Sequence, residues 1–411
     1  MKRSADIRRL YRGRIISRLK EHRQAIDPRK RDLAPAVLDS GPVRFVLARH
    51  FGFCFGVDTA VEIAYRTLEA NPDRRIFFLS EMIHNPRVNG DLRDRGVRFI
   101  FSPLGEQLVA WDELDRDDIV VVPAFGTTLE MEEKLAERGV DPYIYNTTCP
   151  FVEKVWKRSD QLGRQNYTVV IHGKATHEET RATFSHSVRG APTVVVLGLD
   201  EARVLADIIE GKAGLEVFEE RFRQKCSKGF DPALDLIRIG VVNQTTMLAT
   251  ETREISRVLR DAMSARYGAE NLGEHFADTS DTLCYATNEN QNATYALVER
   301  GADLVIVVGG YNSSNTSHIV ELCRERLPTY FIANETEILS PELIRHFSLE
   351  ERKVVLTEGW LPPRRPIEIT LTCGASCPDA VLEDVLCRVH SFFPESRPLD
   401  ETLEDYIAGK S

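Results

Sequence analysis

Several features of common protein classes are missing from this 411-residue chain. No apolar run approaches the roughly 20 residues needed to span a bilayer, and no low-complexity segment occurs. The formal net charge of -10 lacks the positive excess that a general nucleic-acid binder needs. We therefore expect neither membrane nor nucleic acid as a partner. A small anionic ligand remains compatible with this charge, because backbone amides can hold one locally.

The eight cysteines contain no CxxC pair and follow no secretory h-region. That pattern favours thiols in a reducing compartment over a disulfide framework, so we expect a soluble, cytoplasmic protein. Residues 1 to about 40 are rich in Lys and Arg, as in an organelle transit peptide, but they also contain Asp6, Glu21, Asp27 and Asp32. Because transit peptides are poor in acidic residues, a solvated helical extension is favoured over a plastid signal.

Three cysteines occur in similar surroundings. Cys54 lies in Gly52-Phe53-Cys54-Phe55-Gly56, Cys149 in Thr147-Thr148-Cys149-Pro150, and Cys284 in Thr282-Leu283-Cys284-Tyr285. Each is followed at once by apolar residues at helical spacing. The pattern predicts that each of these cysteines directly precedes a helix.

The segments after these helices repeat as well. Apolar strands are predicted at 76–79, 169–173 and 305–310, and second strands with their loops at 120–128, 239–246 and 369–376. The polar loop motifs that follow these first strands begin at His84, His177 and Asn312, which lie 30, 28 and 28 residues after their cysteines. We interpret the chain as three similar α/β modules.

The predicted domain boundaries follow from this repeat. They are a basic N-terminal extension over 1–42, modules over 43–141, 142–277 and 278–394, and a C-terminal tail over 395–411. An insertion near 200–232 in the second module has its own helical periodicity, at Val204, Leu205, Ile208 and Ile209.

Polar clusters lie where strands are predicted to end and helices to begin. They include Ser313-Ser314-Asn315, Gln244-Thr245-Thr246 and Ala375-Ser376. Ligands of α/β proteins bind at such junctions, because unpaired N–H groups and the helix dipole face outward there. For any one cluster, simple helix N-capping is the alternative. Repetition of the junctions in a threefold chain favours a shared ligand site at their centre.

The same centre is where Cys54, Cys149 and Cys284 are expected to converge. Three thiolates without a fourth suit either a Cys₃His zinc site or an iron-sulfur cluster with one iron left open. A lone cysteine is more often a small buried hydrophobe, which is the interpretation favoured for Cys226, Cys323 and Cys387.

Taken together, the motifs resemble those of the hydroxymethylbutenyl diphosphate reductase family, over about residues 43–392 and in the same order. The resemblance rests on Gly52-Phe53-Cys54-Phe55-Gly56-Val57, His84-Asn85-Pro86, Thr148-Cys149-Pro150, His177-Glu178-Glu179, Asn243-Gln244-Thr245-Thr246, Cys284-Tyr285-Ala286-Thr287, Ser313-Ser314-Asn315 and Gly374-Ala375-Ser376. The stretch Ser227-Lys228-Gly229-Phe230-Asp231-Pro232 and the loop Pro123-Ala124-Phe125-Gly126 resemble its plant and cyanobacterial branch.

This resemblance implies a fold and a reaction. The fold is a cloverleaf of three pseudo-threefold-related α/β modules around a central [4Fe-4S] cluster on Cys54, Cys149 and Cys284, one per chain. The reaction is the two-electron reductive dehydroxylation of (E)-4-hydroxy-3-methylbut-2-enyl diphosphate to isopentenyl and dimethylallyl diphosphates, the last step of the methylerythritol phosphate route to isoprenoids. Ferredoxin or flavodoxin is the implied electron donor.

The resemblance also implies roles for individual residues. Glu179 is the implied proton source, and a carboxyl beside a dianionic ligand should have a raised pKa. The implied diphosphate ligands are His84, His177, Thr245, Ser313, Ser314, Asn315 and Ser376. Cys373 and Cys377, next to the Ser376 loop, are alternative candidates for cluster ligands.

Two other functions remain open on the sequence. A quinolinate synthase-like dehydratase shares the threefold plan and a three-cysteine cluster, although the motifs around its cysteines differ. A non-catalytic iron-sulfur sensor on the same fold is the second alternative. Loss of Glu179 or of the 313–315 loop would favour the sensor, and both are present.

Overall fold

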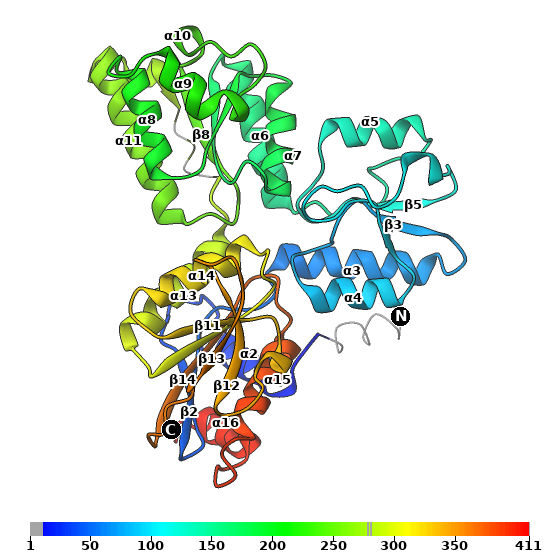
Figure 1. The fold of residues 1–411 in the computed structure, drawn as a ribbon, viewed down its shortest axis with the longest axis vertical. Coiled ribbons are helices and arrows are strands. Elements are labelled where there is room, and N and C mark those ends of the chain that lie inside the picture. Colours follow the sequence, from blue (N-terminus) through cyan, green and yellow to red (C-terminus); the bar gives the residue numbers. More distant parts are fainter. Residues whose placement is uncertain (1–10, 278, 280–281, 411) are drawn as a thin grey trace. The chain divides into compact units, whose positions relative to one another are not determined.

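The computed structural model describes residues 11–277, 279 and 282–410 (Figure 1). It divides into two compact units. Unit 1 comprises the residues up to Arg66, Ile83–Asp91 and the residues from Ala286 onward, and unit 2 comprises Thr67–Met82 and Leu92–Tyr285. The predicted extension over 1–42 falls partly outside the described residues, because residues 1–10 are not among them.

Unit 1 contains a mixed sheet with the strand order β1-β2-β14-β10-β11. Only the β1–β2 pair is antiparallel, and the other neighbours are parallel. A separate antiparallel pair is formed by β12 and β13. The strands are β1 (Ala36–Asp39), β2 (Val43–Leu47), β10 (Leu304–Val308), β11 (Thr329–Ile332), β12 (Leu343–Ser348), β13 (Lys353–Glu358) and β14 (Ile367–Cys373). The helices are α2 (Arg14–Ile26), the start of α3 (Phe55–Ala70), α4 (Pro86–Asp94), α13 (Tyr285–Arg300), α14 (Ser314–Arg324), η5 (Glu335–Glu337), α15 (Asp379–His390) and α16 (Leu399–Ile407).

Unit 2 contains two parallel sheets. The first has the order β4-β3-β5 and the second β7-β6-β8-β9. Their strands are β3 (Ile76–Phe78), β4 (Arg98–Phe99), β5 (Ile119–Val121), β6 (Thr168–His172), β7 (Thr193–Val196), β8 (Ile239–Asn243) and β9 (Phe276–Ala277). The helices are η1 (Trp111–Glu113), α5 (Leu129–Glu137), α6 (Pro150–Arg164), α7 (Glu178–Val188), α8 (Leu199–Ile209), α9 (Leu215–Phe222), η2 (Arg223–Lys225), α10 (Pro232–Asp235), α11 (Ala249–Tyr267), η3 (Ala269–Asn271) and α12 (Leu272–His275).

The three parallel arrangements share one connectivity. In each, the strand that follows the cysteine-led helix lies between two later strands of its own module and pairs in parallel with both. Thus β3 pairs with β4 and β5, β6 pairs with β7 and β8, and β10 pairs with β11 and β14. Within the described residues, the chain is therefore an α/β protein with three sheets built mainly of parallel strands, as the sequence repeat predicts.

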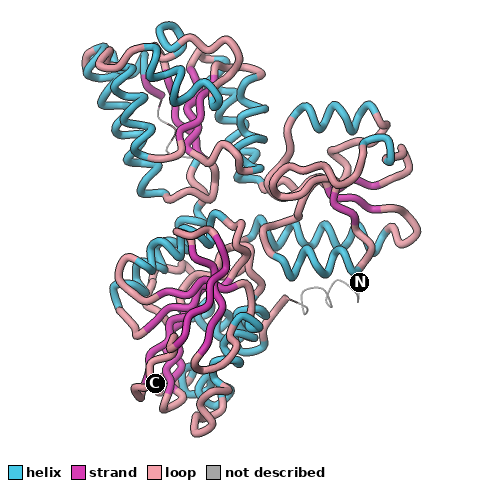
Figure 2. Tube along the Cα trace, in the orientation of Figure 1, coloured by secondary structure: helices cyan, strands magenta, loops and turns pink. Residues whose placement is uncertain are grey.

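The central strands are nearly continuous apolar runs because both of their faces are covered. Every residue of β6 and of β10 is buried. In the second sheet of unit 2, α8 and α11 lie on one side and α6 and α7 on the other (Figures 1 and 2). Strands covered on both faces lose the alternation of polar and apolar residues that marks a half-exposed strand.

The two chain ends differ from expectation. The sequence predicts a solvated helix in the N-terminal segment, and the helix is present as α2. The predicted exposure to solvent is wrong, because Ile15, Ile16 and Leu19 are buried in the core of unit 1. The C-terminal residues form α16, and Leu399 and Leu403 bury its inner face in the same core. Apolar residues at helical spacing within these charged segments explain the packing.

Candidate functional site

The three repeated cysteines stand directly before helices, as predicted. Cys54 precedes α3, Cys149 is the N-cap residue of α6 with Pro150 as first helical residue, and Cys284 precedes α13. The amino end of a helix favours a thiolate, which is the form that binds metals. Cys54 belongs to unit 1, whereas Cys149 and Cys284 belong to unit 2.

Loop carbonyls fix the backbone of two of these cysteines. The Cys54 N–H donates to the carbonyl of Ala375 at 3.2 Å, and the Cys149 N–H donates to the carbonyl of Ala124 at 3.0 Å. Each acceptor lies in the loop after the third strand of a sheet. The strand ends therefore set where these two thiols stand.

Cys284 is tied to the end of β8. Two residues before it, the hydroxyl of Thr282 donates to Oδ1 of Asn243 at 2.8 Å. Asn243 is the last residue of β8 and precedes the predicted Gln244-Thr245-Thr246 loop. The Cys284 segment and the Thr245 loop are thus joined within unit 2.

Glu179 is buried in unit 2 and is bonded by Thr245. The backbone N–H of Thr245 lies 2.5 Å from Oε1 of Glu179, and its hydroxyl lies 2.9 Å from Oε2. Burial raises the pKa of Glu179 to about 7, while the two hydrogen bonds from Thr245 act in the opposite direction. A carboxyl with this pKa can give up a proton near neutral pH.

His177 is the N-cap residue of α7. Its Nδ1 accepts the backbone N–H of Glu179 at 3.2 Å, so in the neutral ring Nε2 carries the hydrogen. Phe125 packs edge-on against this ring, with a centroid distance of 5.9 Å. His177 therefore caps α7 through Nδ1, and Nε2–H is its donor group.

The neighbouring Glu178 is a second buried carboxyl. Burial raises its pKa to about 7, and a hydrogen bond from Ser80 acts against that rise. The helix dipole favours ionised carboxylates in a first turn, so burial is the stronger effect at this position.

A cluster of neutral donors surrounds the start of α14 in unit 1. Ser313 is the N-cap residue, and its Oγ accepts the N–H of Thr316 at 3.3 Å. The hydroxyl of Ser376 is 3.4 Å from Oγ of Ser313 and 3.3 Å from the carbonyl of His84. Ser314 is the first residue of the helix. The loops from three parts of unit 1 meet here.

Asn315 connects this cluster to the loop after β14. Its Oδ1 accepts the Ala375 N–H at 2.8 Å, while its buried Nδ2 has no hydrogen-bond partner among the residues that the structure describes. A buried donor without an acceptor costs roughly 1–3 kcal/mol, so an acceptor that reaches it stabilises the site. A phosphate oxygen has the required chemistry.

His84 is a neutral member of the same cluster. Burial lowers its pKa to about 4. Nδ2 of Asn312 lies 3.2 Å from Nδ1 of His84, and a donating amide there leaves the hydrogen on Nε2. His84 therefore offers an N–H donor without a full charge. Asn312 was not identified as a site residue from the sequence.

The burial of the remaining cysteines differs in part from the expectation. Cys323 is fully buried, as predicted, but Cys387 is exposed and Cys226 is only partly buried. Cys373 and Cys377 are fully buried in the apolar core of unit 1. A hydrogen bond with Cys373 and burial raise the pKa of Cys377 well above its ordinary value, which disfavours the thiolate that a metal needs.

The predicted site residues thus form two groups. Unit 1 holds Cys54, His84, Ser313, Ser314, Asn315 and Ser376, and unit 2 holds Cys149, His177, Glu179, Thr245 and Cys284.

Among the helices that the structure describes, no segment is both long and apolar enough to cross a membrane.

Comparisons with known proteins agree in pointing to one family. Residues 45–390 match the family described as LytB protein. The chain is 43% identical over 353 residues to a 4-hydroxy-3-methylbut-2-enyl diphosphate reductase of Synechococcus sp. (strain CC9311), covering 86% of each chain. It is 41% identical over 355 residues to the same enzyme of Gloeobacter violaceus, covering 86% of this chain and 84% of the relative.

Solved structures give the same picture. A structure of (E)-4-hydroxy-3-methyl-but-2-enyl diphosphate reductase, described as the terminal enzyme of the non-mevalonate pathway, matches with a TM-score of 0.51 and 25% identity, covering 84% of this chain and 99% of that one. The reductase of Plasmodium falciparum matches with a TM-score of 0.61 and 19% identity, covering 87% and 90%. At that identity, the second match supports the fold alone.

Proposed function

We propose that Cys54, Cys149 and Cys284 hold a [4Fe-4S] cluster in this protein. The chain belongs to the LytB family and is a 4-hydroxy-3-methylbut-2-enyl diphosphate reductase of the non-mevalonate pathway. The observation that carries the cluster assignment is the repeat itself. Each cysteine stands directly before the first helix of a module, at the same place relative to the central strand.

The donor set fits such a cluster. Three thiols at helix amino ends can each ionise, and Cys54 and Cys149 are only partly buried. Three thiolates leave one iron of a cubane without a protein ligand. When bound, the cluster would pass on the two electrons of an external donor, one at a time, and would provide a Lewis acid for the leaving hydroxyl.

We assign the diphosphate to the neutral donors. His84, Ser313, Ser314, Asn315 and Ser376 contribute from unit 1, and His177 from unit 2. Thr245, which the resemblance also assigns to the diphosphate, gives both of its donor groups to Glu179 in this structure. Two features support this assignment because both favour an anionic acceptor: Nδ2 of Asn315, which lacks a partner within the described part of the chain, and the amino end of α14.

Glu179 is assigned as the proton donor to the leaving hydroxyl. The balanced reaction consumes the allylic alcohol diphosphate, two electrons and two protons, and it yields isopentenyl or dimethylallyl diphosphate and water. One proton leaves with the hydroxyl as water and the other goes to the carbon skeleton. The raised pKa of Glu179 and its fixed hydrogen bonds support the first role.

The cloverleaf arrangement around the cluster is part of this proposal. Its support is the shared connectivity of the three sheets, in which the central strand always follows a cysteine-led helix. A crystal structure of the anaerobic holoprotein, with iron located by anomalous scattering, would test it. Iron ligated by cysteines other than Cys54, Cys149 and Cys284 would contradict the ligand assignment.

The direct test of the cluster uses cysteine variants. Protein purified without oxygen should be brown and contain iron and acid-labile sulfide. It should turn over the allylic diphosphate with reduced methyl viologen. Cys54→Ser, Cys149→Ser and Cys284→Ser should each lose iron and activity, whereas Cys323→Ser and Cys387→Ser should keep both. Full iron content in any of the first three variants would contradict that ligand.

The physiological electron donor is proposed to be ferredoxin or flavodoxin, as the resemblance to the cyanobacterial branch implies. Turnover with each reduced carrier, at matched concentration and potential, distinguishes the two. Absence of turnover with both, in protein that is active with reduced methyl viologen, would reject this assignment.

A further inference from the structure

Helix α2 lies before the family match, which begins at residue 45, yet it is built into unit 1. The carboxylate of Glu383 on α15 accepts the backbone N–H groups of Arg14, Ile15 and Ile16 at 2.9, 2.8 and 2.9 Å. The first N–H groups of a helix have no partner inside it, and the dipole favours an anion at this end. Glu383 therefore fixes where α2 begins.

One side chain of α2 reaches the segment that leads to Cys54. Nζ of Lys20 donates to the carbonyl of Phe51 at 2.8 Å and lies 2.6 Å from Oδ1 of Asp379. The same ammonium lies 4.2 Å from the centre of the Phe51 ring. Lys20 thus ties residue 51 to the first turn of α15, close to the loop that carries Ser376.

Gly52 shows how closely this contact is packed. Its φ of +78° belongs to the left-handed region that favours glycine. A Cβ at this position would lie 2.7 Å from Nζ of Lys20 and 2.4 Å from Oδ1 of Asp379. The turn before Cys54 therefore requires glycine for its backbone conformation and for the approach of the Lys20–Asp379 pair.

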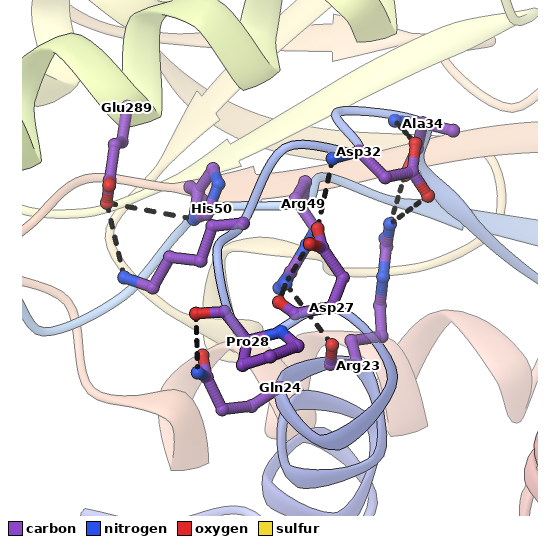
Figure 3. A network of polar contacts seen from close by, with 10 residues as sticks. Arg23, Gln24, Asp27, Pro28, Asp32, Ala34, Arg49, His50 and Glu289 are labelled. Atoms are coloured by element: carbon purple, nitrogen blue, oxygen red, sulfur yellow. Dashed lines mark hydrogen bonds and ion pairs between the residues drawn. The ribbon is translucent and has the colours of Figure 1, made fainter.

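Arg49, two residues before Phe51, is held by the same N-terminal segment (Figure 3). Nη2 of Arg49 donates to the carbonyls of Arg23 and Asp27 at 3.3 and 3.2 Å, at the carboxyl end of α2. Burial lowers the pKa of His50 to about 4, so it is neutral near pH 7 beside Glu289. Glu289 is paired instead with Lys30, at 3.3 Å.

Lys20 and Cys54 also line the same cavity, which has a volume of 330 Å³. Asp379 and Asp58 are further members of its wall. A positive charge near an iron-sulfur cluster raises its reduction potential, since the reduced cluster is the more negative form. Lys20 can therefore affect both the placement of Cys54 and the potential of a cluster bound there.

We propose that α2 and the loop that follows it, residues 11–34, form an internal brace for Cys54, with Lys20 as a positioning residue for cluster binding. The proposal rests on the proposed cluster. Residues 49 and 51 are both held by hydrogen bonds from or to this segment, so the chain leading to Cys54 is fixed from one side.

The first test needs no cluster. Full-length apoprotein is treated with iodoacetamide, and the alkylation rate of each cysteine is followed by mass spectrometry. In Lys20→Gln we expect Cys54 to react several-fold faster than in the unmodified chain, with Cys149 unchanged as an internal control. Lys20→Arg should restore the slow rate, because it keeps the charge and the donors. Arg18→Gln, an exposed position on the same helix, should not change it. Circular dichroism checks that each variant is folded.

The second test uses the reconstituted holoprotein. Iron release to a chelator should be about 10-fold to 100-fold faster in Lys20→Gln, as is common for residues that orient metal ligands. The midpoint potential and the electron paramagnetic resonance spectrum of the cluster should also change, and Lys20→Arg should return both toward their original values. Equal iron release, potential and Cys54 alkylation in Lys20→Gln and the unmodified chain would overturn the brace. An unmodified chain that binds no iron would instead overturn the proposed cluster, and the alkylation test would still decide the brace.

Discussion

Thr245 donates two hydrogen bonds to the carboxylate of Glu179, one from its backbone N–H and one from its hydroxyl. Thr245 lies in the loop after β8 and Glu179 lies in α7, 66 positions earlier in the chain. Both oxygens of the carboxylate are thereby held in a buried site, so the orientation of the acid is fixed before substrate binds. This pair makes the assignment of Glu179 testable.

Glu179→Gln should lower kcat by about 100-fold to 10,000-fold, the usual contribution of a general acid. The amide has nearly the shape of the carboxyl but supplies no proton. Steady-state turnover with reduced methyl viologen measures the effect. Glu178→Gln serves as the matched control and should lose much less activity, while iron content should stay unchanged in both variants. Comparable losses in the two variants would refute the assignment to Glu179 alone.

Thr245→Val should move the pH profile in a defined direction. Glu179 acts while protonated, so activity should fall as pH rises through its pKa, which is about 7. The hydrogen bonds from Thr245 stabilise the carboxylate and lower this pKa. Without the hydroxyl the pKa rises, so the falling limb of kcat/KM should shift to higher pH. Thr245→Ser keeps the hydroxyl and should keep the original limb. A shift to lower pH would contradict this account of the pair.

The fold was largely predictable because its signals are local. Central strands such as β6 and β10 are continuous apolar runs, and the helices after Cys54, Cys149 and Cys284 show apolar residues at helical spacing. The spacing between cysteine and loop then revealed the repeat. Local periodicity also indicates the exposure of Cys387, contrary to its interpretation as a buried residue. On α15 the buried residues Val385, Leu386 and Val389 leave position 387 on the outer face.

The details of the site were less predictable because they depend on contacts between distant residues. Asn312 meets His84 across 228 positions, and Lys20 meets Asp379 across 359. Neither contact leaves a periodic pattern in the sequence. Charge also misled the interpretation of the N-terminal segment, since its many basic residues concealed the apolar face of α2.

His84→Leu should weaken substrate binding more than turnover. His84 is neutral near pH 7 because burial lowers its pKa to about 4, and its Nε2–H is an uncharged donor. Losing one hydrogen bond to a charged ligand costs about 1.5–3 kcal/mol, so KM should rise about 10-fold or more. His318→Gln, on the nearby α14 but in contact with Glu321, should leave KM unchanged. An unchanged KM in His84→Leu would remove His84 from the diphosphate site.

Gly374→Ala should impair the unit 1 donor cluster by crowding alone. An added Cβ at Gly374 would lie 2.0 Å from Oγ1 of Thr316 and 3.4 Å from Oδ1 of Asn315. Contacts this short force the loop after β14 away from α14, which would break the hydrogen bond between Ala375 and Asn315. We expect a raised KM and a melting temperature lower by several degrees, because overpacking costs about 1–3 kcal/mol.

The matched control for this crowding is Gly273→Ala. A Cβ at Gly273 meets no atom of the described residues within 4 Å, and Gly273 lies in the short helix α12, where alanine is the better helix former. Gly273→Ala should therefore keep both KM and melting temperature. Should Gly374→Ala behave like this control, the loop after β14 would have room to adjust. The close packing of that loop would then not be what orders Ser376 and Asn315 for the diphosphate.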